Sequence, residues 1–124
     1  LANKDQLFLC KKTFLKVENR NSIFSRNISK TILNFPIAHA QGNYFTNQDS
    51  LERLEDNDQI IFKYCSEKGI TNVKHNPNGS LKNIAGITNK ERNVLGMMPH
   101  PERAISENMN SDGNLFFEGL KELL

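Results

Sequence analysis

The apolar residues of this chain gather in five short runs, and this pattern constrains the fold more than any other feature. The runs lie near residues 7–18, 31–38, 59–65, 84–88 and 94–98, separated by polar segments rich in Asn, Gly, Ser and Pro. Short apolar runs bounded by turn-forming residues are typical of β-strands. The sequence therefore predicts a sheet of five strands.

The first two runs indicate how these strands are placed. Between Leu7 and Glu18 the residues alternate with a period of two, yet apolar side chains occur on both parities. Such a strand is expected to be covered on both faces, as in a layered α/β sheet. In the second run, Pro36 lacks a backbone N–H, which predicts an edge, an end or a bulge.

Other segments predict helices and connections. Asp49 or Ser50 is expected to cap a short helix over residues 51–55, and the spacing of Leu115, Phe116 and Leu120 predicts a terminal helix that reaches Leu124. Residues 66–83 are expected to form a long surface loop. The runs at 84–88 and 94–98 are expected to form a hairpin.

Composition and length exclude several classes of protein. The chain has 124 residues, 37% hydrophobic and 24% charged, which fits one globular domain. No apolar run approaches the roughly 20 residues of a membrane span, so no membrane partner is expected. A start at Leu1 without a signal-peptide pattern predicts a truncated or internal beginning.

The cysteines and the charge distribution predict the location of the protein and exclude some classes of site and partner. Cys10 and Cys65 form no CxxC pair and have no clustered histidines, so neither a metal site nor a disulfide framework is expected, and a reduced cytoplasmic location is favoured. The net charge is +5 over residues 1–35 and −3 over residues 36–124. The basic residues follow no nucleic-acid-binding motif, so no nucleic-acid partner is expected.

The stretch MMPHPER, residues 97–103, carries the candidate chemistry. Two prolines flank His100 and stiffen the backbone, which favours an extended segment in which His100 and Glu102 point to the same side. A carboxylate there can accept one imidazole N–H and leave the other ring nitrogen free to take a proton. Taken alone, the pair also fits an incidental surface contact.

A family resemblance sharpens this interpretation. The segments PIAH (36–39), NPNGS (76–80), NIAGI (83–87) and NVLGMMPHPER (93–103) occur in order along nearly the whole chain. With them the sequence resembles the small glutaminase subunits of phosphoribosylformylglycinamidine synthases, which are class I glutamine amidotransferases. GMMPHPER is the most specific of these motifs, because HPE alone would indicate only the wider glutaminase class.

The resemblance implies a fold and a function. The fold would be the C-terminal portion of a flavodoxin-like layered α/β domain, with a mixed sheet and a terminal helix. His100 and Glu102 would complete a Cys-His-Glu triad that hydrolyses glutamine and supplies ammonia for purine biosynthesis. The implied partners are a large synthetase subunit, which would hold ATP and Mg, and a small accessory subunit; no cofactor is expected in this chain.

The nucleophile of the family is missing from this sequence. Family members carry it on a glycine-flanked elbow, but no glycine precedes Gly42, and neither Cys10 nor Cys65 has that context. Residues 1–124 are therefore expected to be one partial domain that lacks the elbow and is inactive alone. A non-catalytic remnant or interaction module, and one half of a split glutaminase, remain alternatives.

The other two histidines are not expected to be catalytic. The family usually reads His-Gly-Glu-Gly where this chain has HAQG at residues 39–42, which predicts a weaker contact there. His39 is expected to serve a structural or subunit-contact role. His75 is expected to be exposed.

Overall fold

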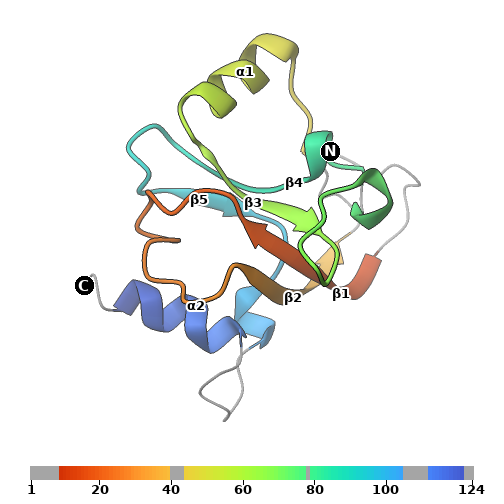
Figure 1. The fold of residues 1–124 in the computed structure, drawn as a ribbon, viewed down its shortest axis with the longest axis vertical. Helices are drawn as coiled ribbons and strands as arrows, with labels where there is room; N and C mark the ends of the chain where they lie inside the picture. Colours follow the sequence, from red (N-terminus) through yellow and green to blue (C-terminus); the bar gives the residue numbers. More distant parts are fainter. Residues whose placement is uncertain (1–8, 40–43, 78, 105–111, 122–124) are drawn as a thin grey trace.

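A computed structural model of the chain describes residues 9–39, 44–77, 79–104 and 112–121 (Figure 1). Its elements are five strands, two helices and three 3₁₀ turns within those ranges. In chain order they are β1 (Leu9–Val17), β2 (Ile32–His39), α1 (Gln48–Asp56), β3 (Ile60–Cys65), η1 (Val73–His75), η2 (Leu81–Asn83), β4 (Ile84–Thr88), β5 (Leu95–Met97), η3 (Pro101–Ala104) and α2 (Asp112–Lys121).

All five predicted strands are confirmed, and they form one sheet in the order β2-β1-β3-β4-β5. Each described pairing is antiparallel, so this part of the sheet is not mixed as the resemblance implied. β4 and β5 are joined by the short segment 89–94, which suits an antiparallel pair, whereas a parallel pair needs a long crossover. The predicted hairpin of β4 and β5 is confirmed.

Several predicted features extend beyond the described ranges. Residues 7 and 8 of the first run, the loop at 40–43 and the end of the terminal helix at 122–124 lie outside the described residues. Within those ranges, no helix is long and apolar enough to cross a membrane.

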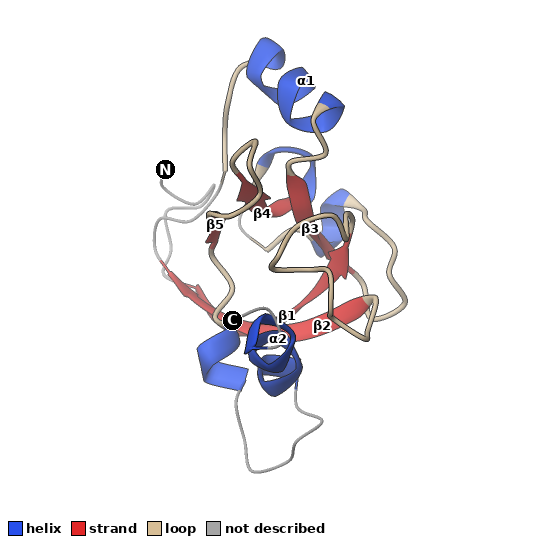
Figure 2. Ribbon diagram, turned by 90° about the vertical axis from the view of Figure 1, so that its left-hand side faces the viewer, coloured by secondary structure: helices blue, strands red, loops and turns tan. Residues whose placement is uncertain are grey.

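The sheet curls until its two edge strands are linked by a short segment (Figure 2). β5 ends at Met97, and the backbone N–H of His100 donates to the carbonyl of Pro36 in β2 at 2.8 Å. Three residues span at most about 10 Å, so the two sheet edges approach each other closely at this point. We call this contact between His100 and the outer edge of β2 the seam.

Pro36 lies on an edge strand, as predicted, because no described strand pairs with the other side of β2. Proline has no backbone N–H, but no hydrogen bond to β1 is lost, because the backbone of this position faces away from β1. Pro36 pairs with Lys12, and Phe14 pairs with Asn34. Asn34 and Pro36, two residues apart, both turn their backbone polar groups away from β1.

The main core lies on the inner side of the curl. Thr13, Leu15 and Val17 are buried on one face of β1, whereas Phe14 and Lys16 on the other face are half-buried, so the predicted cover on both faces is unequal. α2 lies along β2 and inserts Phe116, whose ring meets that of Phe35 edge-on at a centroid distance of 6.1 Å. The cluster comprises Leu15, Val17, Ile28, Leu33, Phe35, Ile61, Phe62, Tyr64, Ala85 and Phe116.

α1 lies at the opposite end of the molecule from α2 (Figures 1 and 2). It packs Leu51 and Leu54 against Ile60 and Ile84 in a second, smaller core. The helix begins earlier than predicted, because Asn47 caps it by accepting the backbone N–H of Ser50 at 2.8 Å. The expected caps at Asp49 and Ser50 were wrong for this reason; both residues belong to the first turn.

The segment 66–83 is more ordered than the predicted surface loop. Asn83 is buried and donates its side-chain amide to the carbonyls of Tyr64 and Asn72, at 3.2 and 2.7 Å. It also accepts from the Asn76 amide at 3.1 Å. Ser80 is buried as well and accepts the backbone N–H of Tyr44. The side-chain hydrogen bonds of Asn76 and Asn83, and not strand pairing, therefore order this segment.

Candidate functional site

The backbone of MMPHPER is held between the sheet edge and a 3₁₀ turn. Pro99 is fully buried, His100 is bonded through its backbone to β2 at the seam, and Pro101 is buried at the start of η3. Glu102 therefore sits in a 3₁₀ turn. The extended backbone that the sequence predicted for this pair was wrong beyond His100, because the fixed φ of Pro101 suits the start of a helical turn as well as a strand.

The side chains of His100 and Glu102 nevertheless meet. The Nδ1 atom of His100 lies 2.8 Å from Oε1 of Glu102. A carboxylate is acceptor-only, so this contact places a proton on Nδ1 and directs the lone pair of the neutral ring to Nε2. The Glu102 side chain is 56% exposed, whereas that of His100 is 26% exposed.

The second ring nitrogen of His100 distinguishes this pair from an incidental surface contact. Nε2 is buried and has no hydrogen-bond partner among the described residues. Most buried polar side-chain atoms are hydrogen-bonded, so each exception calls for an explanation. A ring whose Nδ1 is held by a carboxylate and whose Nε2 is unpartnered can accept a proton from a nucleophile.

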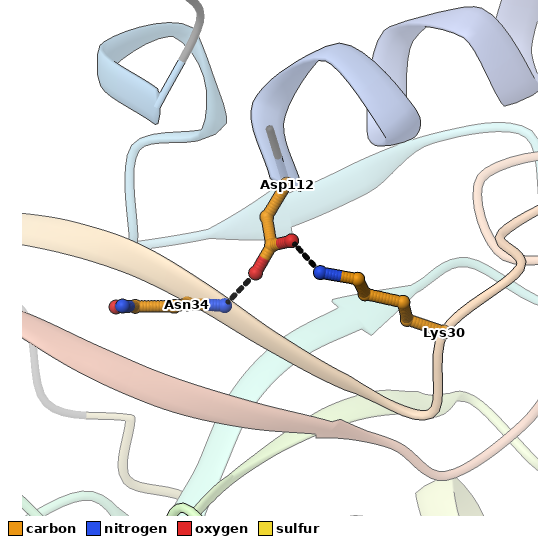
Figure 3. Close-up of polar contacts among 3 residues, drawn as sticks. All are labelled: Lys30, Asn34 and Asp112. Atoms are coloured by element: carbon orange, nitrogen blue, oxygen red, sulfur yellow. Dashed lines mark hydrogen bonds and ion pairs between the residues drawn. The ribbon is translucent and has the colours of Figure 1, made fainter. Parts of the chain in front are cut away.

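A second polar cluster lies on the same edge of β2 (Figure 3). Asp112, the first residue of α2, accepts the backbone N–H of Asn34 at 2.6 Å and pairs with Nζ of Lys30 at 2.7 Å. This cluster was not predicted from the sequence. Asp112 and Asn34 are 78 residues apart, and the only signal in the sequence was an acidic residue at the start of a predicted helix.

Neither cysteine lies on an elbow between a strand and a helix. Cys10 lies within β1, where it pairs with Ala38, and Cys65 is the last residue of β3. Cys65 is buried, and this burial raises the pKa of its thiol to about 11; Lys16 opposes the shift and Glu18 adds to it. Because the thiolate is the reactive form, Cys65 is an inert core residue at neutral pH.

The remaining histidines lie on other elements than the pair. His39 ends β2, where it pairs with Leu9. His75 ends η1 and is half-buried, so the predicted exposure was wrong; it lines a cavity of about 280 Å³ with Cys65, Lys74 and Pro77 among others. The folding of residues 72–83 around the Asn76 and Asn83 hydrogen bonds accounts for this burial. Among the described residues, no group of three His, Cys, Asp or Glu side chains is arranged to hold a metal ion.

The chain is similar to known proteins of one family. Residues 1–115 match the family of CobB/CobQ-like glutamine amidotransferase domains, and the chain belongs to that family. The fold agrees, because the structure of PurLQS from Thermotoga maritima superposes with a TM-score of 0.74 at 32% sequence identity. That match covers 99% of this chain and 51% of the other.

Curated relatives of one kind recur in the comparison. Phosphoribosylformylglycinamidine synthase subunit PurQ of Pelagibacter ubique is 47% identical over 121 residues, which are 97% of this chain and 53% of the relative. The subunit of the same name from Aquifex aeolicus is 47% identical over 116 residues, 93% of this chain and 51% of the relative. The chain thus spans about half the length of the curated relatives it matches.

Proposed function

We propose that this chain is the C-terminal part of the glutaminase component of a phosphoribosylformylglycinamidine synthase, with His100 as general base and acid and Glu102 as its orienting partner. One observation carries the proposal: Nδ1 of His100 is held by Glu102 while its buried Nε2 has no described partner. The identity of 47% to PurQ subunits supports the substrate, glutamine, and the purine pathway.

In the proposed reaction, each ring nitrogen has a separate duty. Nε2 takes the proton of a cysteine thiol, and the thiolate attacks the carbon of the glutamine side-chain amide. The same proton passes from Nε2 to the leaving nitrogen, which departs as ammonia. Water then attacks the thioester carbon and gives a proton to Nε2; the C–S bond breaks, the proton returns to the cysteine sulfur, and glutamate is released. Glu102 stabilises the imidazolium throughout without itself being protonated.

The cysteine of this scheme comes from outside the 124 residues. Cys10 lies within β1, where it pairs with Ala38, and Cys65 is buried with a thiol pKa of about 11. We therefore expect the 124-residue polypeptide alone to release no glutamate. The lack of a nucleophile also favours two alternatives, a non-catalytic interaction module and one half of a split glutaminase.

The assembly proposed for this component follows its relatives. A large synthetase subunit would receive the ammonia and would hold ATP and Mg, and a small accessory subunit would complete the complex. The similarity to PurLQS from Thermotoga maritima and to PurQ subunits supports a role as one part of a larger complex. We propose a cytoplasmic location for the complex, on the grounds of the cysteine usage of the sequence.

Complementation tests the proposal. The chain is assayed for glutamate release from glutamine, alone and after mixing with the half of the Pelagibacter ubique relative that it does not cover. We expect no release by the chain alone and release by the mixture. His100→Ala should lower the rate of the mixture by more than about 10³-fold, because it removes the base that activates the nucleophile.

His75→Ala is the matched control, because His75 is half-buried on a different element. It should leave the rate of the mixture within about twofold, as expected for a residue without contact to the pair. Full activity of His100→Ala in the mixture would refute the assigned role. A mixture that associates but hydrolyses no glutamine would favour the non-catalytic module.

A further inference from the structure

The outer edge of β2 anchors the chain on both sides of η3. The carbonyl of Pro36 accepts the backbone N–H of His100 at 2.8 Å, and the backbone N–H of Asn34 donates to Oδ2 of Asp112 at 2.6 Å. Residues two apart on a strand turn their backbone groups to the same side. One strand edge therefore fixes the position of His100 and of the start of α2.

The carboxylate of Asp112 is largely buried, and each of its oxygens has a partner. Its side chain is 13% exposed, and its second carboxylate oxygen lies 2.7 Å from Nζ of Lys30, a side chain that is 50% exposed (Figure 3). A carboxylate that is largely withdrawn from water requires hydrogen bonds or a counter-charge. Asp112 has both, and they come from two separate segments, the β2 backbone and the loop that precedes it.

The start of α2 is linked to the His100–Glu102 pair through η3. α2 packs against η3 and against β2, and η3 carries Glu102. Phe116 holds α2 against the core by ring contacts with Phe35 and Phe62, at centroid distances of 6.1 and 6.4 Å. Apolar contacts of this kind fix the depth of a helix better than its position along a strand, because they are non-directional. The hydrogen bond from Asn34 is directional and fixes that position.

From these contacts we infer that Asp112 is a positioning residue for the His100–Glu102 pair: by accepting the Asn34 N–H, it holds α2 and η3 where the Glu102 carboxylate reaches Nδ1 of His100. The inference rests on the function proposed above for that pair. The acceptor oxygen matters here, and the ion pair with Lys30 is secondary, because an exposed ammonium contributes little fixed geometry.

The tautomer of His100 tests this inference directly. In the full 124-residue chain labelled with ¹⁵N, the ring nitrogen shifts report the fraction of neutral His100 that carries its proton on Nδ1. Asp112→Ala should lower the ratio of the Nδ1–H to the Nε2–H form by roughly fivefold, the equivalent of one ordinary hydrogen bond. The spectra are recorded well below the melting temperature, where a loss of global stability alone does not alter the ratio.

Four further variants separate the hydrogen bond from the charge. Asn34→Pro removes the N–H donor at an outward edge position and should give the same decrease with Asp112 in place. Asp112→Asn and Lys30→Met keep an acceptor at position 112 and should retain the ratio of the unaltered chain. The double variant Asn34→Pro/Asp112→Ala should show no larger decrease than either single variant.

An unchanged tautomer ratio in folded Asp112→Ala, or an equal decrease in Lys30→Met, would overturn the inference. Failure of the proposed function has a different signature. In that case His100→Ala would leave glutamine hydrolysis intact in the complemented mixture, whereas the tautomer ratio would still respond to Asp112→Ala.

Discussion

At His100, the backbone and the ring are held by different parts of the chain. The backbone N–H is bonded to β2, and the ring is bonded to Glu102 in the following 3₁₀ turn. The ring can therefore not turn away from Glu102 without breaking the 2.8 Å contact, while the backbone cannot follow it. This division leaves Nε2 as the nitrogen that is available for proton transfer.

The two residues of this pair could be predicted from the sequence, but their setting could not. A spacing of two between His100 and Glu102 is visible locally, and the flanking prolines indicate a stiff backbone. The burial of Nε2 and the contact with Pro36 depend on the curl of the sheet, which brings together residues 64 positions apart. Asp112 was missed for the same reason.

Cys65 provides a prediction about pH. Its thiol has an ordinary pKa of 9.0, and burial raises it to about 11 in the folded chain. Between these values the unfolded chain loses the proton while the folded chain keeps it, so the free energy of unfolding decreases as pH rises. The loss should approach about 3 kcal/mol once both states are deprotonated, and Cys65 should contribute little pH dependence below about pH 8.

Urea unfolding at pH 8 and at about pH 10.5 measures this loss. Cys65→Ala is the control, because it keeps Cys10 and every other group that titrates in this range. The unaltered chain should lose more stability across the interval than the variant does. Parallel losses in the two proteins would show that the thiol of Cys65 titrates normally in the folded state.

At the scale of elements, the sequence predicted strands better than helix ends or pairing. Each strand is a local apolar run bounded by turn residues, and such runs survive in most tertiary settings. The start of α1 depended on which of several polar residues supplies the cap, and Asn47 competed with Asp49 and Ser50. Strand direction depends on the connections, which the runs themselves do not encode.

The segment between β3 and β4 gives a second prediction, centred on Asn83. This residue is 7% exposed, has a φ of 60°, and forms side-chain hydrogen bonds with Tyr64, Asn72 and Asn76. Asn83→Gly should lower the free energy of unfolding by about 2–4 kcal/mol, because buried partners lose their hydrogen bonds. Asn83→Ala should cost about 1 kcal/mol more, since alanine is strained at positive φ.

Chemical denaturation of the two variants gives both numbers, and their difference isolates the backbone contribution. Equal stability of Asn83→Ala and Asn83→Gly would show that the segment relaxes out of the left-handed conformation. A loss below about 0.5 kcal/mol in Asn83→Gly would show that the hydrogen bonds of this side chain contribute little.

At the scale of the whole molecule, the seam joins what would otherwise be two separate edges of the sheet. β5 and β2 are the outermost strands in the sheet order, yet His100 follows β5 by three residues and bonds to β2. The candidate site therefore occupies the one described place where the first and last strands of the sheet meet. Closure of the seam and geometry of the site should consequently change together.

Pro99 is the residue on which this closure is best tested. Its side chain is fully buried directly before His100. Pro99→Ala removes buried ring carbons and loosens the unfolded chain, so it should lower the free energy of unfolding by about 2–3 kcal/mol. The His100 amide, still able to donate to Pro36, should then exchange with solvent more than about tenfold faster, because exchange requires the seam to open.

Pro77→Ala is the matched control, because Pro77 is a half-buried proline in the segment between β3 and β4 and makes no contact at the seam that the structure describes. It should cost less than about 1 kcal/mol and leave the exchange of the His100 amide in proportion to that small loss. If the His100 amide of the unaltered chain exchanges as fast as in a free peptide, the seam is open in solution. The ring of His100 would then lack its fixed backbone, and Glu102 alone would have to orient it.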